Sequence, residues 1–143
     1  MFTNIKSVYF IGIGGISMSA LAMMLKDRGL IVKGSDLHLS ETTNKLVSLG
    51  IDVAEGNSPE FVQSCDGIVF TGAISEDNPD LNLAKALNKK IFSRSQVLGY
   101  LSKEKKTISV AGTHGKTTTT AMISTILLEA GLDPTIHIGG VLK

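Results

Sequence analysis

The sequence predicts an α/β protein, in which a parallel sheet flanked by helices is followed by the beginning of a second α/β domain. Three observations support this prediction. Between residues 8 and 101, short apolar segments rich in β-branched residues alternate with segments of helical periodicity. One glycine-rich loop follows an apolar segment at residues 12–15, and another does so at residues 112–115. Such alternation is typical of βαβ units, whose strands pair in parallel.

The first expected strand covers residues 8–13 and suits burial on both faces, because most of its side chains are apolar. The segment GIGGIS, residues 12–17, overlaps its end. A helix is expected from Ile16 to Leu25, and Gly29 is well placed to end it in the left-handed conformation. Strand, glycine loop and helix in this order predict a phosphate site at the start of the helix.

A second expected strand, residues 31–33, leads to Ser35 and Asp36. An acidic residue about twenty positions after the glycines is where a Rossmann-like unit holds a ribose hydroxyl. Ser17 stands where the dinucleotide-binding pattern has its third glycine. The residues leave three interpretations open: an NAD(P) site, a site for another diphosphate nucleotide, or glycines needed only for close packing of helix and strand.

The middle of the chain continues the alternation. Helices are expected over residues 41–49, 59–65, 79–87 and 94–101, and strands over residues 51–54, 67–71 and 90–92. Ser40 is expected to cap the first of these helices. The strand ends at Gly12, Ser35 and Thr71 should lie along one edge of the sheet, where open α/β sheets bind ligands. Arg94 is a candidate contact for a diphosphate because its guanidinium group is planar.

The charged segment 102–106 is expected to link a first domain, residues 1–101, to the start of a second, residues 107–143. The second domain is expected to be incomplete. One strand, one helix and a further strand that begins in the tail, residues 132–140, do not suffice to bury the faces of a parallel sheet.

The second glycine loop has the order of a P-loop. An expected strand, Ile108–Ala111, leads into GTHGKT at residues 112–117, and a helix follows. The backbone N–H groups of such a loop can surround a phosphate. Lys116 would reach the β- and γ-phosphates of ATP, and the hydroxyl group of Thr117 would bind Mg²⁺. The match is incomplete, because Val110 stands where the general pattern has its first glycine.

Composition and charge argue against several classes of function. A formal net charge of +1 gives no sign of a nucleic-acid partner or of binding to a charged membrane surface. No apolar stretch approaches the roughly twenty residues of a membrane-spanning helix, and no secretory signal is visible. The single cysteine, Cys65, has no partner for an internal disulfide and is expected to be structural. A cytoplasmic location is therefore expected.

Several segments resemble the Mur ligases, enzymes of peptidoglycan synthesis. They are GIGGISMSALA at 12–22, GSD at 34–36, TGAISEDNP at 71–79, and AGTHGKTTTT at 111–120 with AGLDPT after it. The resemblance extends over essentially the whole chain. It implies an N-terminal Rossmann-like domain for a UDP-sugar, a central ATPase and a C-terminal domain, of which the chain matches the first and the opening of the second.

The activity that the resemblance implies is that of an ATP-dependent ligase acting on UDP-N-acetylmuramate and L-alanine. ATP would phosphorylate the muramoyl carboxylate, and the amine of L-alanine would then attack the acyl phosphate. The family's amino-acid site and further Mg²⁺ ligands lie outside this sequence. We therefore expect the 143-residue chain alone to be inactive as a ligase, while still binding the UDP-sugar.

The resemblance also implies site residues, and it assigns the first glycine loop to a UDP-sugar rather than to NAD. Those implied for the UDP-sugar are Gly14, Gly15, Ile16, Ser17, Ser35, Asp36, Thr71, Gly72, Ala73, Ile74, Asn78 and Arg94. Those implied for ATP are Gly112, Thr113, His114, Gly115, Lys116, Thr117 and Thr118, with Lys116 and Thr117 catalytic and Thr117 the Mg²⁺ ligand. Asn57 departs from the family pattern, which often has histidine there.

Three alternatives differ from this interpretation. One is a recycling ligase that joins a whole peptide to the same UDP-sugar and shares the GTHGKT segment. Another is an oxidoreductase domain that binds NAD. The last is a nucleotide-binding module without catalytic activity.

Overall fold

The structure, a computed structural model, describes residues 4–138. The chain divides into two compact units, residues 1–104 (the first unit) and residues 105–143 (the second unit). The strands of the first unit are β1 (Ser7–Ile11), β2 (Ile31–Asp36), β3 (Asp52–Glu55), β4 (Gly67–Phe70) and β5 (Lys90–Ser93). Its helices are α1 (Ile16–Asp27), α2 (Glu41–Ser48), α3 (Pro59–Ser64), α4 (Pro79–Ala86) and α5 (Arg94–Lys103).

The five strands form one sheet in the order β3-β2-β1-β4-β5, and every neighbouring pair is parallel. Because β2 and β3 lie on one side of β1 and β4 and β5 on the other, the strand order reverses beside β1. Ligands of open α/β sheets bind at such a switch point. The predicted α/β class and Rossmann-like parallel sheet are confirmed.

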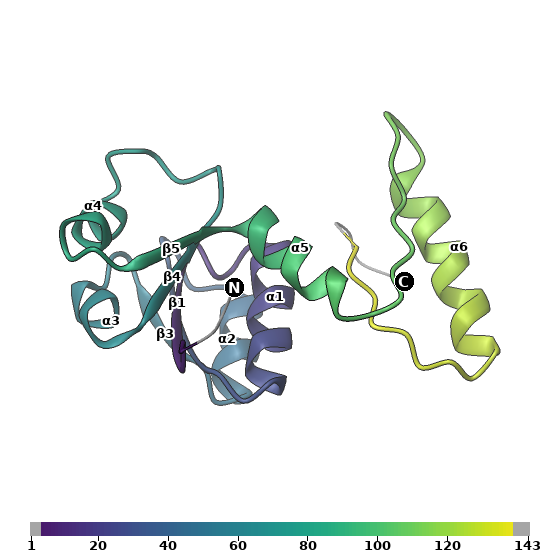
Figure 1. Ribbon diagram of the computed structural model, residues 1–143, viewed down its shortest axis with the longest axis horizontal. Coiled ribbons are helices and arrows are strands. Elements are labelled where there is room, and N and C mark those ends of the chain that lie inside the picture. Colours follow the sequence, from purple (N-terminus) through teal and green to yellow (C-terminus); the bar gives the residue numbers. More distant parts are fainter. Residues whose placement is uncertain (1–3, 139–143) are drawn as a thin grey trace. The chain divides into compact units, whose positions relative to one another are not determined.

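Helices cover both faces of this sheet (Figure 1). One core cluster joins α1, α2 and α5 to the sheet through residues such as Leu21, Leu46 and Val97, and a second joins α3 and α4 through Val62 and Leu81. All five residues of β1 are buried, as expected for a central strand. Cys65 is also buried, which agrees with its predicted structural role.

The helix boundaries follow from local chemistry. Ser40 caps α2 in a reciprocal capping box with Thr43, as its position predicted. The side chain of Asn78 accepts a hydrogen bond from the N–H of Leu81 and so caps α4, which begins at a proline. Gly29, with φ of +85°, follows the end of α1 in the left-handed conformation.

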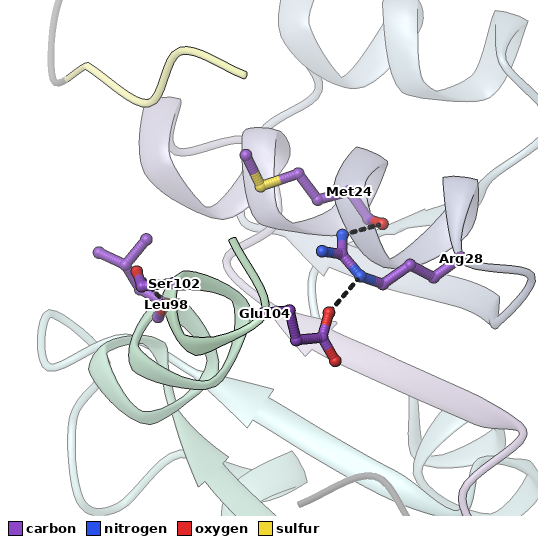
Figure 2. Close-up of polar contacts among 5 residues, drawn as sticks. All are labelled: Met24, Arg28, Leu98, Ser102 and Glu104. Atoms are coloured by element: carbon purple, nitrogen blue, oxygen red, sulfur yellow. Dashed lines mark hydrogen bonds and ion pairs between the residues drawn. The ribbon is translucent and has the colours of Figure 1, made fainter. Parts of the chain in front are cut away.

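The predicted linker 102–106 begins too early. Helix α5 continues to Lys103, and the carboxylate of Glu104 pairs with the guanidinium group of Arg28 on α1 at 3.1 Å. Figure 2 shows this ion pair together with the bond from Arg28 to the carbonyl of Met24. Because these contacts hold the end of α5 to α1, the first unit extends to residue 104.

The second unit contains one helix among its described residues, α6 (Lys116–Glu129). The strand predicted at residues 108–111 is absent from the described structure, and Ile108 is 63% exposed. A strand needs a neighbour to accept its hydrogen bonds, and no described residue supplies one. Residues 132–138 likewise form no strand, and the remainder of that predicted tail strand lies outside the described residues. No helix within residues 4–138 is long and apolar enough to span a membrane.

Candidate functional site

A crevice of about 500 Å³ lies at the C-terminal edge of the sheet. It is lined by residues that follow β1, β2, β3 and β4, so four separate segments form its walls. The lining residues are Ile11, Gly12, Gly14, Gly15, Ser35, Asp36, Leu37, His38, Ser40, Gly56, Asn57, Thr71, Ala73, Ile74 and Asn78. The predicted gathering of Gly12, Ser35 and Thr71 at one edge is confirmed.

The glycine loop after β1 is fixed by β2. The N–H groups of Gly12 and Ile13 both donate to the carbonyl oxygen of Ser35, at 2.8 and 2.9 Å. The N–H of Gly14 donates to the carboxylate of Asp36 at 2.8 Å. Gly12 has φ of +79°, a conformation that side chains disfavour. The end of β2 thus determines the path of the loop.

Gly14 has no room for a side chain. A Cβ atom at this position would lie 2.8 Å from Oδ2 of Asp36 and 3.1 Å from a methyl carbon of Thr43. Helix α1 begins two residues later with Gly15 as its N-cap, and no side chain caps it. Its first N–H groups are therefore available to an anion in the crevice.

Positive charge is scarce in this crevice. Among the described lining residues there is no lysine or arginine, one carboxylate, Asp36, and one histidine, His38. Arg94 is exposed at the start of α5 and does not line the crevice. A diphosphate would therefore be held mainly by backbone N–H groups and the dipole of α1.

The crevice brings together most of the predicted UDP-sugar residues. Gly14, Gly15, Ser35, Asp36, Thr71, Ala73, Ile74 and Asn78 line it, whereas Ile16, Ser17, Gly72 and Arg94 do not. Sequence analysis did not assign His38, Ser40, Gly56 or Asn57 to the site. They follow β2 and β3 in segments without a phosphate-binding pattern. The position of these strand ends was the signal for all four, and Asn57 was also marked by its departure from the family pattern. The contacts of the predicted residues with a UDP-sugar stay predictions.

The second glycine loop has a backbone conformation that suits an anion site, because it leads directly into the N-terminus of a helix. Gly115 has φ of +77° and is the N-cap of α6, which has 14 residues and no side-chain cap. The ammonium group of Lys116 donates to the carbonyl oxygens of Gly112 and Thr113, at 2.6 and 3.3 Å. All seven predicted ATP-binding residues are exposed. A helix N-terminus with an adjacent lysine fits a phosphate group, and the roles of Lys116 and Thr117 stay predictions.

A parallel α/β sheet with a crevice at its switch point defines a protein of the Rossmann-like class. Residues 7–106 match the family model for the Mur ligase family, catalytic domain. This match covers more than half of the chain. The chain therefore belongs to the Mur ligase family, as its motifs predicted.

Named relatives of the chain are ligases of this family. The chain is 50% identical to the UDP-N-acetylmuramate–L-alanine ligase of Acetivibrio thermocellus over 96% of its own length and 29% of the relative's. It is 51% identical to the enzyme of the same name from Clostridium tetani, over 97% and 31% of the two lengths. The chain thus spans less than a third of these curated relatives.

Solved structures show the same similarity. A UDP-N-acetylmuramate–alanine ligase from Thermotoga maritima is 36% identical with a TM-score of 0.87, over 95% of this chain and 32% of that one. A UDP-N-acetylmuramate:L-alanyl-γ-D-glutamyl-meso-diaminopimelate ligase from Neisseria is 34% identical with a TM-score of 0.88, over 96% and 44%.

Proposed function

We propose that this chain is the N-terminal part of an ATP-dependent ligase that joins L-alanine to UDP-N-acetylmuramate in peptidoglycan synthesis. The observation that carries the proposal is a crevice at the switch point of the sheet, beside a glycine loop, in a chain about 50% identical to ligases of that name. The cytoplasmic location expected from the composition is part of the same proposal.

The crevice of the first unit would hold the UDP-sugar. Backbone N–H groups at the start of α1 would face the diphosphate, and Gly14 would let it approach the backbone closely. Asp36 supports this role by holding the N–H of Gly14. A lining without lysine or arginine among its described residues suits a sugar nucleotide held by directed hydrogen bonds.

The loop of the second unit would hold ATP. A phosphate would take the place of the carbonyl groups of Gly112 and Thr113 as the partner of the Lys116 ammonium group, while the first N–H groups of α6 would bind its oxygens. Thr117 would contribute a hydroxyl ligand to Mg²⁺. Together the ammonium group and the metal would neutralise charge that develops on the transferring phosphoryl group.

A recycling ligase is the second candidate, and a specific observation favours it. The Neisseria structure, whose name includes a peptide as well as the UDP-sugar, matches this chain as well as the alanine ligase from Thermotoga does. Both candidates place the same UDP-sugar in the crevice. They differ only in the amine that is joined to it.

Calorimetric titration of the 143-residue chain tests the crevice. We expect UDP-N-acetylmuramate to bind and NAD(H) not to bind. Gly14→Ala should weaken binding of the UDP-sugar about tenfold or more, because its new methyl group would collide with Asp36. Gly99→Ala is the matched control, since no atom lies within 4 Å of its added Cβ. Binding of NAD(H) in place of the UDP-sugar would refute the ligase proposal.

Turnover in a chain extended to the length of the relatives tests the reaction. Phosphate release that depends on UDP-N-acetylmuramate and L-alanine is expected, and release with the tripeptide alone would favour the recycling ligase. Lys116→Ala should lower turnover by about 100-fold or more, because it removes the charge at the transferring phosphoryl group. Turnover unchanged by Lys116→Ala would refute the assignment of the second loop.

A further inference from the structure

A buried polar cluster lies beneath the nucleotide crevice. Tyr9, Ser35 and Asp80 are 0%, 2% and 0% exposed. The hydroxyl oxygen of Tyr9 lies 2.5 Å from the hydroxyl oxygen of Ser35 and donates to Oδ2 of Asp80, also at 2.5 Å. The same carboxylate oxygen accepts the backbone N–H of Ser58 at 2.9 Å. Within residues 4–138, Oδ1 of Asp80 has no hydrogen-bond partner.

The direction of these hydrogen bonds follows from proton counting. A carboxylate only accepts, and a phenol has one proton to donate. Because Tyr9 gives that proton to Asp80, the hydroxyl group of Ser35 must donate to the oxygen of Tyr9. Burial and the hydrogen bond to Asp80 raise the pKa of Tyr9 well above its ordinary value, which keeps the phenol protonated. The hydroxyl oxygen of Ser35 is then left with acceptor capacity only.

Each partner in the cluster is attached to a different wall of the crevice. Ser35 is the next-to-last residue of β2, lines the crevice, and accepts the N–H groups of Gly12 and Ile13 at its carbonyl oxygen. Ser58 follows the lining residue Asn57 directly. Asp80 lies in the first turn of α4.

Asn78, the N-cap of α4, also joins α4 to the segment after β3, at the surface. The amide of Asn78, which lines the crevice, lies 3.4 Å from the side-chain oxygen of Asn57. Tyr9 and Asp80 together therefore join the end of β2, the segment after β3 and the start of α4, beneath the crevice.

We propose that Tyr9 and Asp80 are positioning residues for the nucleotide crevice. They hold three of its walls together and fix the hydroxyl group of Ser35 as a hydrogen-bond acceptor. This inference rests on the proposed function, and it assigns to Ser35 a partner that donates, an O–H or N–H group of the nucleoside, rather than a phosphate oxygen.

Packing alone does not explain the cluster. A phenylalanine at position 9 would keep the edge-to-face contact with Phe61, whose ring centroid lies 5.9 Å away. A carboxylate taken fully out of water is costly unless it is paired. A merely structural position would therefore be better filled by apolar residues, whereas a fixed hydrogen-bond direction at a ligand site requires the polar ones.

The test compares Tyr9→Phe with a variant that perturbs the same core but keeps every polar group of the cluster. Ile68→Val removes one methylene group from the core on the α3 and α4 face, where Tyr9 also packs. We expect Tyr9→Phe to weaken binding of UDP-N-acetylmuramate about tenfold, and Ile68→Val to leave it unchanged. Asp80→Asn, which keeps an acceptor oxygen, should weaken binding less than Tyr9→Phe. Equal affinity of wild type and Tyr9→Phe would overturn the proposal, as would an equal loss in Ile68→Val.

Ligand analogues identify the group that donates to Ser35. Binding of UDP, its 2′-deoxy and 3′-deoxy forms and its N3-methyl form is measured in wild type and in Tyr9→Phe. The analogue that lacks the donor should bind wild type about tenfold more weakly than UDP, and Tyr9→Phe should reduce that ratio. Ratios that are the same in both proteins for every analogue would overturn the acceptor assignment.

A measurement without ligand separates failure of this inference from failure of the proposed function. We expect the amides of residues 12–15 and 56–58 to exchange with solvent about tenfold faster in Tyr9→Phe than in Ile68→Val. If wild type does not bind UDP-N-acetylmuramate, the proposed function is wrong, and the exchange rates alone decide whether Tyr9 positions the walls. Equal exchange in the two variants would show that it does not.

Discussion

The two glycine loops of this chain have related sequences and very different surroundings. The first loop follows a strand that is buried on both sides, and β2 binds it through three N–H groups. The second follows residues 108–111, which form no strand, and its lysine bonds to carbonyl groups of its own loop. The comparison teaches that a glycine pattern predicts a loop, whereas the neighbouring strands determine how tightly the loop is held.

Close packing around the first loop gives the largest expected effect. In Gly34→Ala, the new Cβ would lie 2.3 Å from Cδ1 and 2.7 Å from Cβ of Ile13, a buried residue of the loop. Because the Cβ of Ile13 is fixed to the backbone, we expect a loss of about 3 kcal/mol in the free energy of unfolding. Urea unfolding followed by tyrosine fluorescence measures it, since both tyrosines, Tyr9 and Tyr100, lie in the first unit.

The matched change in the second loop is Gly115→Ala. Its added Cβ meets no atom within 4 Å, although φ of +77° carries a local strain of about 1–2 kcal/mol. We expect no shift of the tyrosine-detected transition, because the strain belongs to the second unit. A comparable shift in both variants would contradict the separation of the two units.

Core substitutions give the next largest effect. Val97 in α5 is completely buried, whereas Ile126 in α6 is 67% exposed. Val97→Ala should lower the free energy of unfolding by about 2 kcal/mol, because it leaves a cavity. Ile126→Ala should change it by less than about 0.5 kcal/mol. Circular dichroism during urea unfolding measures both, and a large loss in Ile126→Ala would mean that α6 has a packed face.

The sequence was sufficient to predict the first unit because each of its elements carries a local signal. Ser40 precedes a helix as a cap, Asp36 ends a strand at the expected distance from the glycines, and Pro79 begins a helix. The segment 108–111 carries a similar signal without the same outcome. Its β-branched residues favour a strand, but hydrogen bonds from neighbouring strands are what form one.

Local patterns did not predict the buried cluster of Tyr9 and Asp80 beneath the crevice. Tyr9 belonged to an apolar run that predicted only burial, and Asp80 had the position of an ordinary acidic residue in the first turn of a helix. The two are 71 positions apart and meet only because β4 and α4 return to the strand that contains Tyr9. A single sequence contains no signal for a pairing at that distance, so the residues behind the site emerged only from the fold.

Capping of the helices is expected to have a smaller effect, and it also distinguishes the units. Helix α2 has the side-chain cap Ser40, whereas α6 begins at Gly115 without one. Ser40→Ala should lower the free energy of unfolding by about 1 kcal/mol, because an N–H of the first turn loses its acceptor. Ser48→Ala at the other end of α2 is the control, with an expected change below about 0.5 kcal/mol. Equal losses would mean that the cap contributes nothing specific.

The smallest expected effect concerns the N-terminal ends of β1 and β4, which are joined by the carboxylate of Asp66. No such contact is described for residues 108–111 of the second unit. One oxygen of Asp66 accepts the N–H groups of Lys6 and Ser7, at 2.8 and 3.0 Å, and these bonds lower the pKa of Asp66. A lowered pKa stabilises the fold above the unfolded value of about 3.9, and this contribution is lost as pH falls through the folded value. Because Asp66 is exposed and screened, Asp66→Asn should cost no more than about 1 kcal/mol at pH 7.

The pH dependence decides whether this contribution is electrostatic. The difference in the free energy of unfolding between wild type and Asp66→Asn should be constant from pH 7 to about pH 5 and should shrink toward zero below about pH 4. Urea unfolding at a series of pH values measures it. A difference that persists at low pH would mean that the Asp66 side chain contributes through the geometry of its hydrogen bonds to Lys6 and Ser7, with the charge contributing nothing.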